Sequence, residues 1–293
     1  MSFTIQDCDQ GFTLVETESG QSMHSRIGAW KEAQDLYIAQ SQLDHRLATQ
    51  DSPLVIFDVG MGIAANALAA LEIAQASSYP RTLKIVSFEN RLDGIRTALN
   101  HPQHFPWLEK HRKKIELLLE YKSWSAPGVE WSLFDGNFFD ELKSAHAPDL
   151  IFYDFYGPKT CPTLWGLNAF ERLYLHCKDQ HCLLITYSAS TAVRSAMLLA
   201  GFEVGYGQPT SLKSESTLAS SKALSLAHPL DPTWLEKLTR SNAVAPLDQP
   251  KKEAESWIQK IRSRPQFCRS LFNNRESDSS LQALDSNFQR RMR

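Results

Sequence analysis

Between residues 53 and 224, short apolar runs alternate with segments whose apolar residues recur every three or four positions. The apolar runs are typical of strands covered on both faces of a parallel sheet, and the helical period is typical of the crossovers that join such strands. The predicted strands are 53–62, 82–90, 129–138, 148–158, 181–190, 202–208 and 216–224. The predicted helices are 63–77, 92–101, 113–124, 167–177 and 191–201. This alternation predicts an α/β fold: a doubly wound, mostly parallel, seven-stranded sheet with right-handed crossovers.

The sequence pattern differs before and after this central region. Residues 10–25 alternate around a Glu-Ser-Gly turn and predict a β-hairpin, and residues 27–43 have helical spacing. After residue 224, proline-bearing connectors precede a short helix at 253–264 and a polar end. The chain therefore divides into three parts. Residues 1–50 form an N-terminal hairpin and helix that could act as a lid, residues 51–224 form the central domain, and residues 225–293 form a helical tail.

Composition and charge exclude several classes of protein. The net charge of −2 excludes a polycationic nucleic-acid binder. The charge is unevenly distributed, however: residues 222–293 hold 13 basic and 8 acidic side chains, whereas the rest of the chain holds 18 basic and 25 acidic ones. No apolar run is long enough to cross a membrane, and the first residues lack the pattern of a secretory signal. The five cysteines form no Cys-x-x-Cys pair, and no metal-ligand spacing occurs. We therefore expect a cytoplasmic protein without a membrane segment or a metal.

A glycine turn and an acid mark the ends of the first two central strands. Gly60 and Gly62 lie between strand and helix, where glycine lets the backbone approach a ligand and the helix start offers free N–H groups. A tight turn alone is the alternative, and the absence of Gly-Lys-Ser/Thr excludes a P-loop. Glu89 ends the second strand, where an acid can accept both ribose hydroxyls of a nucleoside, or serve as a cap or a surface acid. Together these residues predict a nucleoside site.

The third and fourth central strands also end in polar residues. Asp135 and Asn137 could bond an adenine amino group, or they could belong to a simple Asp-Gly turn. Asp154 stands beside aromatic residues and two prolines, which makes it a candidate base or substrate clamp, with a structural cap as the alternative. His24, at the end of the predicted hairpin, could belong to a lid over this site, or it could be an ordinary core or surface histidine.

These features, in this order, resemble a known family. A glycine turn, an acidic second strand, a polar third strand and an Asp-aromatic fourth strand look like a class I S-adenosylmethionine-dependent methyltransferase with a Rossmann-like sheet. More narrowly, the chain resembles the methyltransferase half of the bacterial bifunctional enzyme that modifies the tRNA wobble uridine. The resemblance covers about residues 10–220, and Ala64 and Phe155 stand where that family keeps glycine. The matching stretches are 22–33, 60–66, 154–165 and 186–202, followed by Lys213.

The resemblance implies S-adenosyl-L-methionine as the methyl donor and tRNA as the partner, with methyl transfer to the amine of 5-aminomethyl-2-thiouridine. It implies Asp154 as the catalytic residue, which would orient the amine or take its proton. The residues that it implies for donor binding are Glu32, Gly60, Gly62, Asn66, Glu89 and either Asp135 or Asn137. For the substrate, the resemblance implies that Tyr156 and Trp165 contact the base. It makes Lys159, Arg194 and Lys213 candidates for contacts with phosphates, and the alternative for each is a solvated surface charge.

Two other functions fit the same sequence. One is a methyltransferase of this fold that acts on a small molecule or a protein, which the acidic central domain suits. The other is a non-catalytic cofactor-binding protein, which the departures at Ala64 and Phe155 suit. The flavin-dependent oxidase half of the bifunctional enzyme needs its own Gly-x-Gly-x-x-Gly, and the sequence has none, so we expect a stand-alone methyltransferase. The sequence does not determine the oligomeric state.

Overall fold

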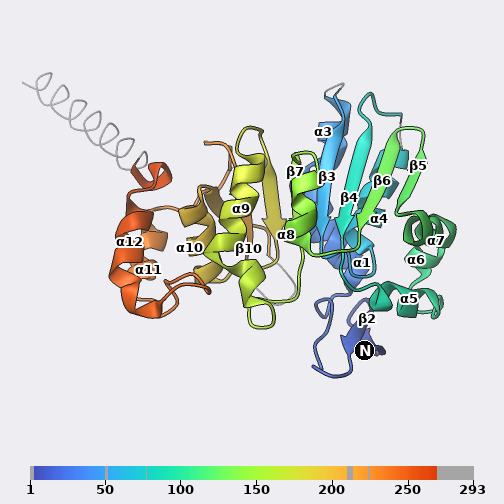
Figure 1. Ribbon diagram of the computed structural model, residues 1–293, viewed down its shortest axis with the longest axis horizontal. Helices are drawn as coiled ribbons and strands as arrows, with labels where there is room; N and C mark the ends of the chain where they lie inside the picture. The colour runs from blue at the N-terminus through green and yellow to red at the C-terminus, as the bar shows by residue number, and fades with distance from the viewer. Residues whose placement is uncertain (1–2, 50–51, 77, 210–213, 224, 269–293) are drawn as a thin grey trace, which may run out of the picture.

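A central sheet of eight strands organises the molecule, in the order β5-β6-β4-β3-β7-β8-β10-β9 (Figure 1). The computed structural model describes residues 3–49, 52–76, 78–209, 214–223 and 225–268. The strands of the central sheet are β3 (Leu54–Val59), β4 (Leu83–Phe88), β5 (Ser123–Ala126), β6 (Val129–Phe134), β7 (Leu150–Tyr153), β8 (Leu183–Thr186), β9 (Glu203–Gly207) and β10 (Ser216–Ser220). The predicted α/β class is confirmed.

The order of the strands reverses at β3. This strand pairs in parallel with β4 on one side and with β7 on the other. Parallel pairing continues from β4 to β6 and from β7 to β8, whereas β10 runs antiparallel to both β8 and β9. In open α/β sheets, ligands bind outside the carboxyl ends of the strands at such a reversal. The ends of β3, β4 and β7 are therefore the place to look for a site.

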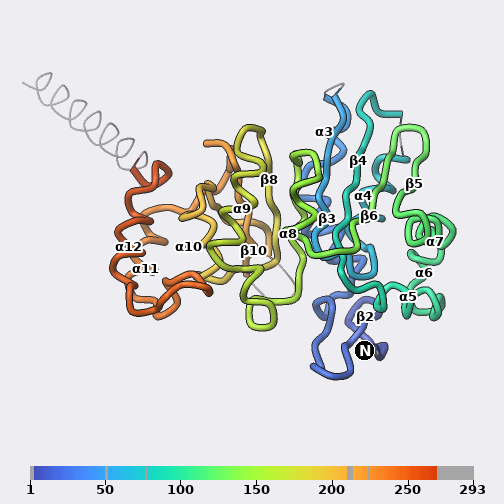
Figure 2. The backbone as a smooth tube through the Cα atoms, in the orientation of Figure 1, coloured from blue at the N-terminus to red at the C-terminus, as the bar shows by residue number. Residues whose placement is uncertain are grey.

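Helices cover both faces of the sheet and bury two hydrophobic cores (Figure 2). Leu54 and Ile56 of β3 face the first core, and Phe57 and Val59 of the same strand face the second. The helices of the first core are α1 (Ala29–Glu32), the π-helical η1 (Ala33–Ile38), α2 (Ala39–Ser41), α3 (Leu43–Ala48), α4 (Ala65–Ala76), α5 (Asp93–Leu99), α6 (Pro106–Glu109) and α7 (Arg112–Tyr121). Those on the other side are α8 (Phe138–Glu141), η2 (Leu142–Ser144), η3 (Pro162–Trp165), α9 (Leu167–Cys177), α10 (Thr191–Ala200), α11 (Pro232–Thr239), η4 (Lys251–Glu253) and α12 (Ala254–Arg262).

The N-terminal hairpin differs from the predicted one in its pairing. Its strands are β1 (Phe3–Cys8) and β2 (Gly11–Glu16), which pair antiparallel. Residues 21–25, the predicted partner, form one isolated bridge with β2, between Val15 and Ser22, and backbone hydrogen bonds from Glu16 to Gln21 and from Met23 to Leu14 flank it at 2.9 and 2.8 Å. The reason is that β1 also carries alternating apolar residues, Phe3 and Ile5, which pack against the first core. The prediction of a hairpin was correct, but its boundaries at 10–25 were wrong.

The predicted count of seven central strands was also wrong, because β5 is an additional edge strand. The helical pattern of 113–124 runs into Ser123 and Trp124, but α7 ends at Tyr121, and its C-cap Lys122 adopts a left-handed conformation with φ +59°. The chain then turns back, and Ser123 pairs with Ser132 of β6. A four-residue edge strand directly after an amphipathic helix leaves no separate periodic signal.

The described part of the predicted tail packs against the sheet edge at β9. Helices α11 and α12 contribute Trp234 and Ile261 to the second core. The Gln266 side chain accepts from the Val204 N–H at 2.9 Å and donates to the carbonyl oxygens of Val204 and Leu230, at 2.7 and 2.8 Å. These bonds satisfy backbone groups of an edge strand that would otherwise face solvent. Among the helices of the described residues, none is both long and apolar enough to span a membrane.

The glycine turn after β3 makes a prediction about stability. Gly60 has φ +83°, and a Cβ there would lie 2.8 Å from the Asp154 carbonyl oxygen, whereas Gly20 has φ +66° and open space around it. We expect Gly20→Ala to lower the free energy of unfolding by about 1 kcal/mol, from backbone strain alone. Gly60→Ala should lower it by about 3 kcal/mol, because a backbone collision adds to the same strain. Urea unfolding followed by circular dichroism compares the two variants, and equal losses would contradict the packing argument.

Candidate functional site

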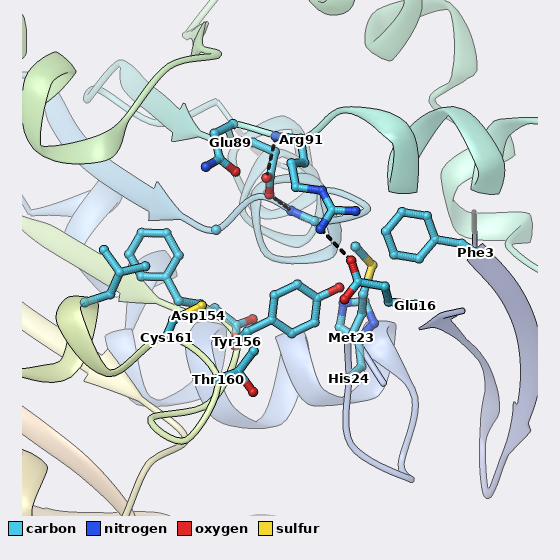
Figure 3. A pocket seen from close by; sticks show the side chains of 15 residues that line it. Phe3, Glu16, Met23, His24, Glu89, Arg91, Asp154, Tyr156, Thr160 and Cys161 are labelled. Atoms are coloured by element: carbon cyan, nitrogen blue, oxygen red, sulfur yellow. Dashed lines mark hydrogen bonds and ion pairs between the residues drawn. The ribbon is translucent and has the colours of Figure 1, made fainter. Parts of the chain in front are cut away.

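A cavity of about 240 Å³ lies at the carboxyl ends of β3, β4 and β7, beneath the N-terminal hairpin (Figure 3). The glycine turn forms one wall, and the loop from Asp154 to Leu164 forms the opposite wall. Its lining residues are Phe3, Glu16, Met23, His24, Gly60, Gly62, Glu89, Asn90, Arg91, Asp154, Phe155, Tyr156, Thr160, Cys161 and Leu164. The structure therefore brings together four residues predicted from the sequence as site residues, Gly60, Gly62, Glu89 and Asp154, with Tyr156 from the predicted substrate set.

Glu89 is held in place at the end of β4. One carboxylate oxygen accepts from the backbone N–H of Gly62 and the other from that of Arg91, both at 3.0 Å. Each carboxylate oxygen has two lone pairs, so both oxygens keep the capacity to accept a further hydrogen bond from the cavity. Burial raises the pKa of Glu89 above its usual range, although these backbone bonds oppose the shift. The fixed, buried carboxylate fits the two ribose hydroxyls of a nucleoside.

The glycine turn also has the form of a cradle for such a ligand. Gly60 and Gly62 both have positive φ, at +83° and +54°, which only glycine adopts readily. Beneath the turn, Asp58 is fully buried, and its Oδ2 accepts from the Ser87 hydroxyl at 2.7 Å. Its Oδ1 has no hydrogen-bond partner among the described residues, and burial raises the pKa of this carboxyl to about 7. The turn thus places a bare backbone above a buried carboxyl, whose ionised form a cationic ligand nearby would favour.

Asp154 lies where the glycine turn meets the end of β7. Asn66, which is 5% exposed, donates its amide to Asp154 Oδ2 at 2.8 Å. Burial, and after it the negative charge of Glu32, raises the pKa of Asp154 to about 7. Asn66, predicted as a donor-binding residue, therefore orients this carboxylate from the first helix of the central domain. A carboxyl with this pKa can exchange a proton near neutral pH.

A second cavity of about 260 Å³ adjoins the first on the other side of Asp154. It shares Met23, His24, Asp154, Phe155 and Tyr156 with the first cavity. Its own lining residues are Gln21, Ser22, Ser25, Glu32, Gly157 and Tyr187. Two carboxylates, from Asp154 and Glu32, thus face one small chamber, and this arrangement suits an acceptor that carries an amine.

Two contacts fasten the N-terminal hairpin over these cavities. The Glu16 carboxylate pairs with the Arg91 guanidinium at 2.5 Å, as Figure 3 shows. On the other side of the cavity, the Thr160 hydroxyl donates to the Gln21 side-chain oxygen at 2.6 Å. The hairpin is therefore part of the walls of the site.

His24 lines both cavities, although its position in the sequence is only a weak indication of a functional role. Its Nδ1 lies 3.3 Å from the Thr13 hydroxyl, and its Nε2 lies 3.9 Å from where a Cβ on Gly62 would stand. Burial lowers the pKa of His24 to about 4, so the imidazole is neutral at physiological pH. A neutral imidazole beside the glycine turn does not repel a cationic ligand.

Several predicted site residues lie outside the two cavities. Asp135 forms an ion pair with Lys122 at 2.5 Å, and Asn137 caps α8 by accepting from the Phe139 N–H at 3.0 Å. Lys159 is exposed on the loop after β7. A contact of Asp135 or Asn137 with adenine, or of Lys159 with phosphate, stays a prediction. Lys213 lies outside the described residues.

Two predicted substrate contacts are placed in the interior and need correction. Trp165 is 0% exposed, and its indole N–H donates to the Tyr156 carbonyl at 2.8 Å, so it supports the loop and offers no face to a base. Arg194 is 2% exposed and bonds to Glu215, Ser216 and Thr217 at 2.7–3.0 Å. This guanidinium is occupied in holding β10, so it does not meet a phosphate. Within the described residues, no group of three or more potential ligands is placed to hold a metal ion.

Comparison with known proteins agrees with this geometry. Residues 128–222 match a family model described as S-adenosyl-L-methionine-dependent methyltransferase. An uncharacterized protein of Methanocaldococcus jannaschii is 28% identical over 229 residues, which are 73% of this chain and 61% of that protein. The tRNA 5-methylaminomethyl-2-thiouridine biosynthesis bifunctional protein MnmC of Polaromonas naphthalenivorans is 24% identical over 216 residues, 68% of this chain and 32% of that protein. The chain thus spans under two thirds of the first relative and about a third of the second.

A solved structure shows the same fold. MnmC2 from Aquifex aeolicus superimposes with a TM-score of 0.70 at 24% identity, over 89% of this chain and 85% of that chain. The sheet with its switch point at β3, the glycine turn and Glu89 are what donor binding in this fold requires. The chain is thus similar to S-adenosyl-L-methionine-dependent methyltransferases, and among them to MnmC.

Proposed function

We propose that this enzyme methylates the primary amine of 5-aminomethyl-2-thiouridine at the tRNA wobble position, in the cytoplasm. The observation that carries the proposal is the pair of adjoining cavities that meet at Asp154. One cavity has the features of a methyl-donor site, and the other presents two carboxylates to an amine. The printed name of the MnmC relatives, which refers to tRNA 5-methylaminomethyl-2-thiouridine biosynthesis, supports this choice of acceptor.

The residues of the chain have separate tasks in this reaction. Gly60, Gly62 and Glu89 would hold S-adenosyl-L-methionine, which supplies an electrophilic methyl group. Asp154, oriented by Asn66, accepts a hydrogen bond from the acceptor amine and so directs its lone pair toward that methyl group. As the nitrogen–carbon bond forms, the bond from that carbon to the donor's sulfur would break, its electron pair would leave with the sulfur as a neutral thioether, and the nitrogen would become a secondary ammonium. Asp154 then takes one proton and leaves a neutral methylamine, a transfer that suits a carboxyl with a pKa of about 7.

Phe155 and Tyr156 are aromatic side chains at the boundary of the two cavities, and Tyr156 is the predicted neighbour of the acceptor base. Tyr156 lines both cavities, and its carbonyl is fixed by Trp165. Burial raises the pKa of the Tyr156 hydroxyl to about 12, so the ring stays neutral. Stacking on a neutral aromatic ring is a common way of holding an unpaired RNA base.

A second candidate is methyl transfer to a small-molecule amine. The interior positions of Arg194 and Trp165 favour it, because they remove two of the contacts expected for RNA. Both candidates use the same donor site and the same carboxylate, so only the acceptor distinguishes them.

Mass spectrometry of tRNA nucleosides tests the acceptor directly. A strain that lacks the gene should accumulate 5-aminomethyl-2-thiouridine, and the purified enzyme with S-adenosyl-L-methionine should methylate tRNA from that strain. Unchanged wobble uridines in the deletion strain, together with no transfer to its tRNA, would favour the small-molecule acceptor.

Glu89 provides a test of donor binding. Glu89→Gln keeps the shape of the side chain but replaces the charged acceptor, and a hydrogen bond to a charged group contributes about 1.5–3 kcal/mol. The dissociation constant of S-adenosyl-L-methionine should therefore rise by roughly 10- to 100-fold in calorimetry. The matched control is Glu130→Gln, at an exposed ion pair with Lys84 on the sheet. A similar affinity in both variants would exclude Glu89 from the donor site.

Asp154 provides a test of the chemical step. Asp154→Asn keeps an oxygen for the Asn66 amide but removes the negative charge, so donor affinity should fall by no more than about tenfold. Turnover should fall by at least roughly 100-fold, because the amine loses its proton acceptor. The two quantities are measured by calorimetry and by a radiolabelled methyl-transfer assay. Wild-type turnover in this variant would refute the role of Asp154.

A further inference from the structure

The helix that follows the hairpin contains a π-helical segment beside the site. Residues 27–43 have the spacing of one continuous helix, but the structure breaks it into α1, η1 and α2. Segments of π-helix are rare, occur mostly as single turns within α-helices, and are frequent at functional sites. Here η1 spans Ala33–Ile38 and carries Tyr37, which is 0% exposed. The question is what this buried tyrosine does.

The ring of Tyr37 is packed, but its hydroxyl is not satisfied. The ring lies 5.4 Å, centroid to centroid, from Phe152 of β7. The hydroxyl oxygen is buried and makes no hydrogen bond of good geometry with any residue that the structure describes. A buried polar group without a partner is costly, so phenylalanine would fit this position better unless the hydroxyl has a task.

The group that this hydroxyl faces is Asp154, because, besides burial, a hydrogen-bond contribution between the two side chains raises the pKa of Tyr37 and partly offsets the rise in the pKa of Asp154. Burial, and after it the negative charge of Asp154, raises the pKa of Tyr37 well above its usual range, so the hydroxyl keeps its hydrogen and is a donor. Hydrogen bonds of an active site often close fully only when the substrate binds. A short adjustment of the carboxylate would therefore give the hydroxyl its missing partner.

Other groups around Asp154 do not offer the same donor. Glu32 and Asp58 add negative charge, His24 is neutral, and the Tyr187 hydroxyl already donates to the Phe155 carbonyl at 2.9 Å. The amide of Asn66 is one donor to the carboxylate, at 2.8 Å. A carboxylate accepts about four hydrogen bonds, so after bonds from Asn66 and from one further side chain it can still accept one from the substrate amine.

We propose that Tyr37 is a positioning residue for Asp154: its hydroxyl donates to the carboxylate on the side opposite the acceptor and keeps the carboxylate ionised and oriented. This role rests on the proposed function, in which Asp154 receives the amine. In this arrangement, the π-helical segment η1 places a hydrogen-bond donor from the N-terminal part of the chain at the end of β7. Asn66 and Tyr37 then hold one carboxylate from two different helices.

The test is the protonation of Asp154 in Tyr37→Phe. A donor to a carboxylate favours the ionised form, so its removal should raise the titration midpoint of the Asp154 carboxyl by about one pH unit. Carbon-13 NMR of protein labelled at aspartate carboxyls measures this midpoint, and the Asp154 signal is identified by its loss in Asp154→Asn. The acid limb of the pH–turnover profile should move upward by the same amount. An unchanged midpoint in Tyr37→Phe would overturn the proposal.

The matched control is Tyr153→Phe. Tyr153 is also fully buried, but its hydroxyl donates to the Leu164 carbonyl, so its removal should leave the Asp154 midpoint where it is. Equal shifts in both variants would show a general effect of core hydroxyls and would overturn the proposal. If Tyr37→Phe folds poorly, Tyr37→Met removes the same hydroxyl and should give the same shift.

The titration needs no substrate, so it separates the two proposals. A wild-type enzyme that fails to methylate tRNA contradicts the proposed acceptor but leaves the carboxyl titration as a valid test of Tyr37. Normal methylation with equal midpoints in wild type and Tyr37→Phe supports the acceptor and refutes the positioning role.

Discussion

The close approach of the Gly60 turn to the backbone of Asp154 is the constraint on which the site depends. The Asp154 N–H donates to the Val59 carbonyl at 2.9 Å, and a Cβ on Gly60 would lie 2.8 Å from the Asp154 carbonyl oxygen. Because no side chain stands between them, α4 starts next to the end of β7, and Asn66 reaches the Asp154 carboxylate. The turn proposed for the donor and the carboxylate proposed for the acceptor are therefore one packed unit. A displacement of either would change the distance between the two reacting groups, on which the rate of a positioned transfer depends strongly.

The N-terminal segment completes this unit. A parallel sheet provides only the floor of a site at its switch point, and the rest must come from elsewhere in the chain. Here the hairpin contributes Glu16 through its pair with Arg91, and the segment after the hairpin contributes His24 to both cavities. The following helix contributes Glu32 to the second cavity. The segment predicted as a lid thus forms walls of both chambers, and the acceptor chamber would not exist without it.

The sequence predicted the parts of the site that follow directly from the strands and missed those that depend on packing. Gly60, Glu89 and Asp154 follow apolar runs, so the meeting of strand ends at one edge of the sheet brings them together. The interior positions of Trp165 and Arg194 depend on the loop after β7 and on the antiparallel strand β10, which periodicity does not describe. The π-helical segment has the same spacing of apolar residues as an α-helix, so its displaced side chains have no signature in the sequence. The meeting of strand ends is therefore predictable from local signals, whereas contacts between distant segments are not.

The buried carboxyls give the two cavities a common electrostatic basis. Asp58, Glu89 and Asp154 all have raised pKa values, with burial as the first cause in each case. Such groups favour a nearby positive charge, because a cation stabilises their ionised forms. The sulfonium of S-adenosyl-L-methionine is such a cation, and its binding would favour the ionised Asp154 that the acceptor amine requires. By linkage, ionisation of Asp154 would in turn strengthen the binding of the donor. The burial that disfavours charge on these carboxyls therefore couples the binding of the methyl donor to the ionisation of Asp154.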